Sequence, residues 1–523
     1  MSGGFVLNSP IVAGQSAFRI SSYTTERDKG IKYSDPANEE MGWDSYETLR
    51  GKLLIEPDNL PGFSALFTIA HTEDSPGTSQ VTGPNFLERE FIGTAAFTDF
   101  RDGTADNYIA DVSYEFRRGL ALRSITAYAE TQTVIKTAAD AAFIRRGDNT
   151  AGTDVTQDLR LEISNEGNGL SGVVGLYYGS FERSAYNNQF VYPPFFGFPA
   201  PDAIVRYTTA DIASETTNLA AYADLRYRWD EWSVIAGGRL LHDEVLSKSS
   251  GDILNLGSLG NNNIPLQYDR LTENSKSTFD EFLPKVGLTY DLTPNQTVGA
   301  TYNKGYRTGF TQLTLDNRYV DVAPEYMDAY ELSYRSYWLN KTFDLNANVF
   351  FYDYTGQQVL TLDSLSRPEI ANAGSSHAHG AEFEARWRPI QPLQLFAALG
   401  LMQSKFDELV INNNDFSGNE YPEAPAYNIS AGAMYRSATG WFVGANVRHT
   451  DGYYSKAGVA NDPTTLLDSN TVVDARAGWE WEHYTLTVFA KNLLDEQYLT
   501  QKEATAGWIG DERMVGMTVT GRF

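Results

Sequence analysis

A pair of histidines two residues apart has the spacing best suited to metal chemistry in this sequence. In His377-Ala-His379 both imidazoles fall on one side of an extended chain, and imidazole nitrogen is a common metal ligand. Both rings share that side of the chain with Phe383 and Trp387. We therefore interpret the pair as residues at the edge of an apolar surface, and we expect no metal site and no cofactor.

Motifs for catalysis are missing from the chain. The sequence has no Cys, which removes cysteine nucleophiles, thiolate metal sites and disulfides. Its six His residues are scattered, and neither HExxH nor GxSxG occurs. The carboxylates at Glu423, Glu503 and Asp511–Glu512 lack the regular spacing of a calcium loop. We therefore expect no catalytic residues and a protein that is not an enzyme.

One segment is unusually rich in aromatic residues. Phe190-Val-Tyr-Pro-Pro-Phe-Phe-Gly-Phe-Pro199 holds five aromatic side chains and three prolines in ten residues. Such a segment is costly to expose to water, so it either packs on neighbouring loops or forms a stacking surface for an aromatic, sugar-like or amphipathic ligand. The candidate ligand-binding residues are Phe190, Tyr192, Phe195, Phe196 and Phe198, and Tyr453, Tyr454 and Trp508 from other long links could complete the site.

The overall composition excludes several classes of function. The chain has 523 residues, with 67 acidic against 41 basic side chains and a formal net charge of −26. This charge repels phosphate backbones, so we expect no nucleic-acid partner. Aromatic residues make up 13% of the chain, yet the mean hydropathy is −0.37. No apolar run approaches the roughly 18 residues of a membrane helix, but a membrane barrel would hide its apolar residues in alternation.

Segments with a period of two recur from end to end and predict β-strands. In Leu219–Trp229 the odd positions are apolar and end in Tyr227 and Trp229, whereas Asp224, Arg226 and Arg228 lie opposite them. A soluble sandwich would turn its charged face to water. Apolar faces that end in aromatic residues favour a membrane barrel with lipid outside and a polar lumen. On that inner wall we expect Arg160, Arg226 and Arg386 to pair with Asp158, Asp224 and Glu382.

The links between these segments alternate between short and long. We count 21 strands, including a stub at Gly3–Leu7, and short links such as Arg118–Gly119 and Asp230–Glu231 separate long ones such as Ser184–Glu215. Outer-membrane barrels are connected in this way. The rhythm is unbroken, so residues 1–523 are expected to form one barrel domain. Bacterial barrels have even strand numbers, which suggests 22 strands with one lost upstream of Met1.

The last predicted strand ends the chain on an aromatic residue. In Met514–Phe523 the apolar positions Val515, Met517 and Val519 alternate with Thr518 and Thr520, and the chain ends at Phe523. Alternation that finishes on a terminal aromatic is typical of outer-membrane proteins. We therefore interpret Phe523 as a barrel-assembly signal.

Several stretches together resemble the barrel of the TonB-dependent outer-membrane receptors. Any one of them is a weak signal, but their number and common order make a strong one. In chain order they are Gln157-Asp-Leu-Arg-Leu161, Val174-Gly-Leu-Tyr-Tyr178, Ala236-Gly-Gly-Arg239, Leu283-Pro-Lys-Val-Gly-Leu-Thr-Tyr290, Thr301-Tyr-Asn-Lys-Gly-Tyr-Arg-Thr-Gly309, Pro324-Glu-Tyr-Met-Asp-Ala-Tyr-Glu-Leu332, Ala371-Asn-Ala-Gly374, Gly380-Ala-Glu382, Val488-Phe-Ala-Lys-Asn-Leu-Leu-Asp-Glu-Gln-Tyr498 and Gly521-Arg-Phe523.

The resemblance implies a function but covers only the barrel. The family's N-terminal plug, which fills the lumen and carries the TonB-binding box, has no counterpart in this sequence, and neither has the first strand. The resemblance implies integral location in the outer membrane of a Gram-negative bacterium, with outer-membrane lipid around the wall. It also implies TonB-dependent uptake of a bulky nutrient such as a siderophore, an extracellular small-molecule ligand, with TonB acting only through such a plug.

Two alternatives and one structural expectation follow from the missing parts. The chain could instead be a plugless passive pore or a remnant barrel without energised transport. An outer-membrane hydrolase would need a compact catalytic cluster, which the sequence does not offer. An unpaired strand edge in hydrocarbon costs several kcal/mol per unsatisfied group. If the chain folds alone, we therefore expect Gly3–Leu7 to pair with Met514–Phe523.

Overall fold

The computed structural model follows the chain from Met1 to Phe523. It describes all residues except 93–98, 138–143, 166, 192–205, 260–261, 314–318, 363–367, 412, 456–458 and 504. Among the described residues, no helix is both long and apolar enough to cross a membrane.

One antiparallel sheet of 21 strands forms the wall of the molecule, as the sequence predicts. Each strand pairs with the next wall strand along the chain, so the sheet is a simple meander. The wall strands are β1 (Ser2–Val12), β2 (Ser16–Asp28), β4 (Trp43–Ile55), β5 (Phe63–Ser75), β8 (Asp99–Arg117), β9 (Leu120–Thr137), β10 (Ile144–Ile163), β11 (Gly169–Val191), β12 (Arg206–Trp229), β13 (Trp232–Leu259), β14 (Asn262–Thr293), β15 (Gln296–Arg307), β18 (Glu325–Trp338), β19 (Phe343–Thr355), β22 (Ser375–Ile390), β23 (Leu393–Glu408), β26 (Tyr427–Arg436), β27 (Trp441–Thr450), β30 (Asn470–Glu480), β31 (Tyr484–Lys491) and β34 (Met514–Gly521).

Smaller elements lie in the long links. Most are two-stranded ribbons, and one three-stranded sheet joins β32, β33 and β6. They are β3 (Lys32–Tyr33), β6 (Gln80–Thr82), β7 (Glu90–Phe91), β16 (Phe310–Leu313), β17 (Tyr319–Val322), β20 (Gln358–Leu362), β21 (Pro368–Asn372), β24 (Val410–Ile411), β25 (Asn414–Asp415), β28 (Tyr453–Tyr454), β29 (Leu466–Leu467), β32 (Leu499–Lys502) and β33 (Ala506–Ile509), with the 3-10 helices η1 (Pro36–Gly42), η2 (Phe86–Glu88) and η5 (Pro463–Thr465).

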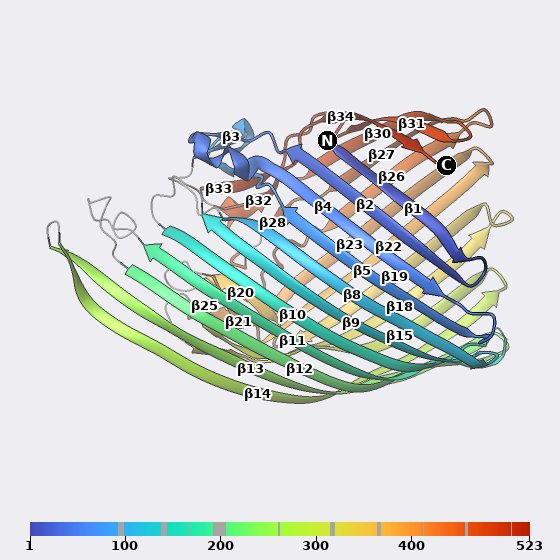
Figure 1. Cartoon of the computed structure of the whole chain (residues 1–523), viewed down its shortest axis with the longest axis horizontal. Coiled ribbons are helices and arrows are strands. Elements are labelled where there is room, and N and C mark those ends of the chain that lie inside the picture. The colour runs from blue at the N-terminus through green and yellow to red at the C-terminus, as the bar shows by residue number, and fades with distance from the viewer. Residues whose placement is uncertain are drawn as a thin grey trace.

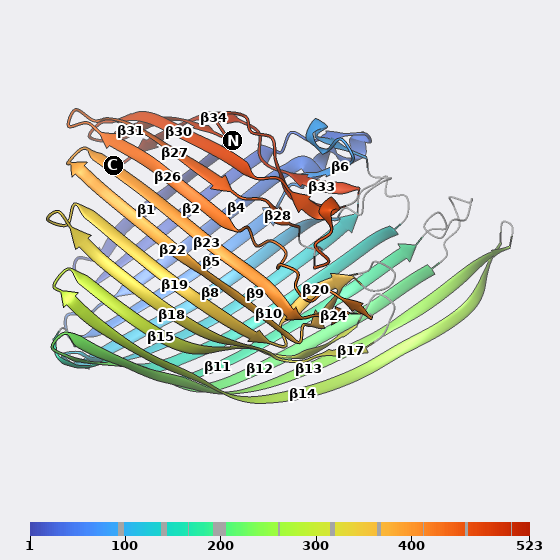
Figure 2. The same ribbon diagram turned by 180° about the vertical axis from the view of Figure 1, so that it is seen from behind.

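The strands wrap into a tilted barrel with two unlike ends. Figures 1 and 2 show the strands running obliquely along a near and a far wall, with short turns at one end and the small loop elements at the other. The short turns have local causes: Gly119 closes the link from β8 to β9 with φ +76°, a left-handed conformation that glycine adopts without strain. The strands β13 and β14, of 28 and 32 residues, extend furthest at the loop end.

The wall has an apolar outer face and a polar inner face, as the alternation predicts. On β12 the outward residues Leu219 and Tyr227 are exposed, whereas Asp224 and Arg226 point inward and are half-buried. Ion pairs such as Lys285 with Asp224, at 2.6 Å, line the interior. Within the described residues the buried hydrophobic clusters lie in the loops, and the apolar side chains of the wall face outward, as in membrane barrels.

The predicted pairing of the first and last strands is wrong. Among the described ladders, β1 pairs only with β2 and β34 pairs only with β31. The two ends of the sheet are joined through loops instead: β33 pairs with β6, and Arg27 at the end of β2 contacts Asp511 at 2.8 Å. These contacts join β1 and β34, the two ends of the sheet, at the loop end, and we call this junction the seam. Among the described strands, no other strand pairs with the free edges of β1 and β34.

Candidate functional site

A hydrophobic cluster at the loop end joins links from both ends of the chain. Its buried residues come from the link after β2, the region of β6 and β7, and β33. Tyr33, Phe86 and Leu499 pack on it. We name it the first loop core, and its buried members are Ile31, Met41, Val81, Phe91 and Ile509.

One buried arginine ties this core together. Arg89 is 6% exposed and adopts φ +59° directly after η2. Its guanidinium donates hydrogen bonds to three backbone carbonyls, those of Lys29 at 2.6 Å, Gly30 at 3.2 Å and Gly510 at 3.0 Å. It also lies 3.0 Å from the carboxylate of Glu512. A buried charge is tolerated when it is paired and hydrogen-bonded in this way.

Titratable groups beside Arg89 respond to this environment. Burial alone would raise the pKa of Asp511, but the hydrogen bond from Arg27 and the nearby Lys29 and Arg89 cations lower that pKa below its usual range. Burial raises the pKa of Tyr33, and the neighbouring Asp28 raises it further. The two ends of the sheet are therefore held together by ionised groups of opposite sign.

A second hydrophobic cluster covers another part of the loop end. It joins β20, the link between β21 and β22, the end of β23, β24 and the link after β28, and Tyr421 packs on it. Burial raises the pKa of Tyr421. We name it the second loop core, and its members are Val359, Ala373, Phe406, Leu409, Ile411 and Val459. Two separate cores mean that the described loops have packed interiors of their own.

A cavity of about 450 Å³ opens between three links at this end. Phe86 and Leu87 of η2 form one wall, β29 contributes Leu467, and Tyr498 precedes β32. Two acidic side chains, Glu88 and Asp468, and one basic side chain, Lys502, complete the lining. Within the described part of the chain, no ion pair engages the Lys502 ammonium. The cavity can thus take an amphipathic ligand that carries an anionic group.

The predicted aromatic residues outside segment 190–199 gather beside this cavity. Tyr453 and Tyr454 form β28 and pair with Leu467 and Leu466 of β29. The Tyr453 hydroxyl donates to the Thr500 carbonyl at 3.1 Å, and the Thr500 hydroxyl donates to the carbonyl of Trp508 at 3.2 Å. These three aromatic residues therefore frame the cavity, although none of them lines it.

The other predicted binding residues belong to the aromatic segment 190–199, and the structure describes only its first two residues. Phe190 lies in β11, where its backbone pairs with Tyr207. Tyr192, Phe195, Phe196 and Phe198 lie outside the described residues. Sequence reasoning missed Phe86 and Tyr498 as lining residues. In the sequence, Tyr498 stands out only as the last residue of a stretch that resembles the receptor barrels. The residues around Phe86 form no motif that predicts a binding site.

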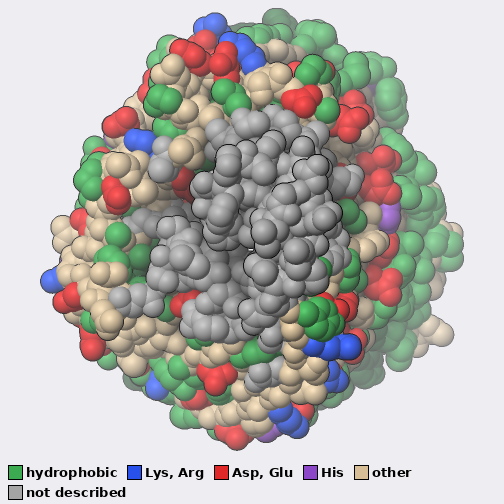
Figure 3. Space-filling model, turned by 90° about the vertical axis from the view of Figure 1, so that its left-hand side faces the viewer, with side chains coloured by type: hydrophobic (Ala, Val, Ile, Leu, Met, Phe, Trp, Pro, Cys, Tyr) green, Lys and Arg blue, Asp and Glu red, His purple; other side chains and the backbone are tan. Residues whose placement is uncertain are grey.

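The loop end also has an acidic rim and a hydroxyl-rich inner cavity. Figure 3, which faces that end, shows Asp and Glu side chains distributed around its edge. Inside, a cavity of about 370 Å³ lies between β12–β14 and the β16–β17 ribbon. Ser275 and Thr311 share a hydrogen bond of 2.9 Å there, and Ser249 bonds the Tyr319 hydroxyl. We call the opening of the barrel at the loop end the mouth. Hydroxyl groups on the inner side of the wall can bind a polar ligand that has entered through it.

The inner-wall ion pairs differ from the predicted ones. Arg160 pairs with Glu162 at 2.9 Å, and Arg226 donates to hydroxyls of Ser233 and Thr289. The partner of Asp224 is Lys285, two strands away. Gly237 lies between them in the register and has no side chain, so the lysine can reach across it. In the described part of the wall, no ion pair joins Arg386 and Glu382.

The histidine pair lies on the outer face of β22. The His377 ring nitrogen Nδ1 is 2.7 Å from the Asp407 carboxylate, and the two imidazoles stack at 5.9 Å. Both also stack against Phe351, an exposed outward residue of β19. Across the residues that the structure describes, no three His, Cys, Asp or Glu side chains form a group that could hold a metal ion.

Comparisons with known proteins agree with this geometry. The chain is 25% identical over 353 residues to the pesticin receptor of Yersinia pestis, which covers 66% of this chain and 47% of that protein. The chain thus spans about half the length of the curated relatives it matches. The ferric yersiniabactin uptake receptor FyuA from Yersinia pestis has the same fold, with a TM-score of 0.83 at 19% identity, covering 100% of this chain and 78% of that one.

A second solved structure has the same architecture. The pyoverdine outer membrane receptor FpvA from Pseudomonas aeruginosa, bound to pyoverdine, superposes with a TM-score of 0.73 at 14% identity, covering 100% of this chain and 76% of the other. Likeness at these identities shows the fold. The family model for the TonB dependent receptor-like β-barrel matches residues 52–493, most of the chain. This protein therefore belongs to the TonB-dependent receptor β-barrel family.

Proposed function

We propose that this chain is the barrel of an outer-membrane receptor that takes up a bulky ligand by a TonB-dependent route. The observation that carries the proposal is the loop end. Two packed loop cores lie there beside a cavity whose walls are aromatic, apolar and charged, with Lys502 as its basic group. A passive pore has no need of such a mouth. Two structural neighbours, the ferric yersiniabactin uptake receptor and the pyoverdine outer membrane receptor, support the receptor proposal.

The ligand class follows from the mouth and from these neighbours. A siderophore or similar scarce organic ligand would combine apolar or aromatic parts with anionic groups, and the cavity offers Phe86, Tyr498 and the Lys502 ammonium. The frame of Tyr453, Tyr454 and Trp508 would position the lining residues. The Phe190–Phe198 segment stays a predicted part of the same site.

The energised step belongs to parts beyond this barrel. TonB would act through a plug domain supplied by a segment that is not among these 523 residues. In this proposal residues 1–523 form one domain in the outer membrane of a Gram-negative bacterium, with Phe523 read by the assembly machinery. The chain itself would bind and conduct the ligand, with no catalytic step.

Uptake by whole cells tests the proposal. We expect deletion of the gene to abolish accumulation of one ligand from a panel of radiolabelled ferric siderophores, and the intact gene to restore it. A proton uncoupler should stop the restored uptake, because TonB draws on the inner-membrane proton gradient. Undiminished uptake across the whole panel would refute the receptor proposal, and restored uptake that resists the uncoupler would favour a passive pore.

A further inference from the structure

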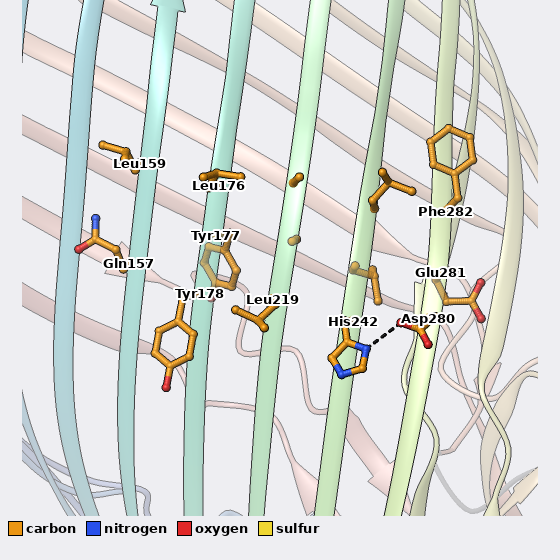
Figure 4. Close-up of a pocket in the computed structure, with 14 residues that line it drawn as sticks. Gln157, Leu159, Leu176, Tyr177, Tyr178, Leu219, His242, Asp280, Glu281 and Phe282 are labelled. Atoms are coloured by element: carbon orange, nitrogen blue, oxygen red, sulfur yellow. Dashed lines mark hydrogen bonds and ion pairs between the residues drawn. The ribbon is translucent and has the colours of Figure 1, made fainter.

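The cavity of about 450 Å³ at the loop end, which we call the loop cavity, is built differently from a cavity of the wall. A groove of about 860 Å³ crosses consecutive strands from β10 to β14, and Figure 4 shows its side chains on strands that lie next to one another. In that groove Leu240 and Phe282 are register partners, so the hydrogen bonds of the sheet fix the spacing of the lining. The loop cavity instead takes its walls from links that belong to the first and the last parts of the chain.

The two sides of the loop cavity face each other across the seam. Phe86 of η2 belongs to the link between β5 and β8, whereas Lys502 belongs to the link between β31 and the last strand, β34. In the described ladders β1 and β34 do not pair with each other. The distance between the two sides of the cavity therefore depends on the short β6–β33 ladder and on side-chain contacts between the loops.

Arg89 is the side chain that spans the seam beside this cavity. It directly follows η2, and its backbone N–H donates to the Phe86 carbonyl at 3.3 Å. Its guanidinium donates to two carbonyls of the link after β2 on one side of the seam and to the carbonyl of Gly510 on the other. The Glu512 carboxylate, 3.0 Å away, adds an ion pair on the same side as Gly510. The end of η2 is thereby tied to both sides of the seam.

The backbone of Arg89 indicates that this side chain is needed at its position. Arg89 has φ +59° and ψ +37°, a left-handed conformation that ends η2 and that glycine adopts without strain. An arginine here accepts that strain, and burial of its charge is also costly unless the donors are engaged. The contacts of the guanidinium offset both costs, because they engage it with three carbonyls and one carboxylate.

Phe86 connects the position of η2 to the shape of the loop cavity. Its ring packs on the first loop core and also lines the cavity. The ring lies so close to β33 that a Cβ on Gly507 would be 2.9 Å from it. Leu499 of β32 packs on the same core and lines the same cavity. A shift of η2 relative to β33 would therefore change the lining.

We propose that Arg89 is a positioning residue for the ligand site, which holds Phe86 at a fixed distance from β32 and β33 across the seam. The inference rests on the proposed function, because it requires that the loop cavity binds the ligand. Arg89 acts through Phe86 and does not itself touch the ligand. Binding and closure of the seam are then linked, so a ligand that contacts both sides of the cavity also stabilises the seam.

Binding to whole cells tests this role. The probes are the radiolabelled ferric siderophores of the uptake panel, offered in the cold to cells treated with a proton uncoupler, so that binding is measured without transport. Arg89→Gly permits the same backbone conformation but removes the guanidinium. We expect it to raise the dissociation constant of the bound siderophore about tenfold, because the lining is no longer preorganised.

Two further variants separate the guanidinium from charge alone. Arg89→Lys keeps the cation but lacks the planar fork of donors, so it should restore only part of the lost affinity. Arg513→Gly is the matched control, because Arg513 lies in the same link as Glu512 but its side chain is half exposed and pairs with Asp495. This control should bind as tightly as the unaltered protein.

A reversible cross-link separates positioning from simple misfolding. In the Arg89→Gly background, Thr82→Cys with Ala506→Cys joins β6 to β33 at register partners. Oxidation should bring the affinity back to within about threefold of the unaltered value, since the disulfide replaces the missing tie across the seam. A reductant should then remove the gain. Unaltered affinity in Arg89→Gly, or a cross-linked form that binds no more tightly than its reduced form, would overturn the proposal.

The same measurements distinguish the failure of this inference from the failure of the proposed function. If the unaltered protein binds no siderophore of the panel, the ligand site is wrong and the role of Arg89 is wrong with it. If the unaltered protein binds one and Lys502→Glu weakens that binding while Arg89→Gly does not, only the role of Arg89 is wrong.

Discussion

In the proposed ligand site at the loop end, single side chains would set which ligands bind. Lys502 gives the loop cavity a cation without an ion-pair partner in the described chain, on a protein whose net charge is −26. Arg89, in contrast, is fully engaged by carbonyls and Glu512. The first side chain is free to meet a ligand, and the second holds the surrounding links in place.

Reversal of charge at Lys502 should weaken ligand binding. We expect Lys502→Glu to raise the dissociation constant of an anionic ligand at least about tenfold, because it removes a charge-assisted contact and adds repulsion. Lys341→Glu, at a short turn on the opposite end, is the matched control and should bind normally. Binding to cells that display equal amounts of each variant measures the effect. Equal affinity of the two variants would exclude the cavity as the ligand site.

Acid should release the contact between Arg27 and Asp511. The folded pKa of Asp511 is lowered, so its contribution to stability is complete above the unfolded value of about 3.9 and is lost as pH falls through the folded value. Protection factors of the first loop core against hydrogen exchange, which are corrected for the pH dependence of intrinsic exchange, should therefore stay constant from pH 7 to pH 5 and fall only in stronger acid. Asp511→Asn should lack this step. Loss of protection between pH 7 and pH 5 in the unaltered protein would contradict the assignment.

At the level of elements, the alternation of apolar and polar residues predicted the strands of the wall but not the short strands in the loops. The 21 strands and their short turns follow from local patterns, such as the period of two in β12 and the glycine at position 119. The β6–β33 pairing joins residues more than 400 positions apart through strands of three and four residues. Segments so short carry no periodicity, and their pairing is set by the first loop core around Val81 and Phe91.

Engineered cysteines can test this pairing because the chain has none of its own. Thr82 and Ala506 are register partners in β6 and β33, and paired residues of antiparallel strands lie within disulfide range. We expect Thr82→Cys with Ala506→Cys to form a disulfide in mild oxidant on intact cells, seen as a mobility change without reductant. Thr82→Cys with Ala477→Cys should stay reduced. Failure of the first pair to cross-link would mean that the two links do not meet.

The molecule as a whole combines packed loops at one end with a sheet whose first and last strands do not pair among the described ladders. The family and barrel could be predicted from sequence because motifs such as Pro324–Leu332 recur in order. Three things could not. The inner-wall partners depend on register, as Gly237 between Asp224 and Lys285 illustrates. The lining role of Phe86 depends on loop packing. The two ends of the sheet, β1 and β34, are linked by loop contacts between residues far apart in the sequence.

The electrical conductance of the protein in a planar bilayer tests the central claim most directly. The protein should be purified from native outer membranes in its intact form and added at single-molecule dilution. A gated receptor holds its lumen blocked, so our account predicts an electrically silent protein that binds its ligand. A steady conductance of the size expected for an open barrel of more than 20 strands would contradict it and favour a passive pore.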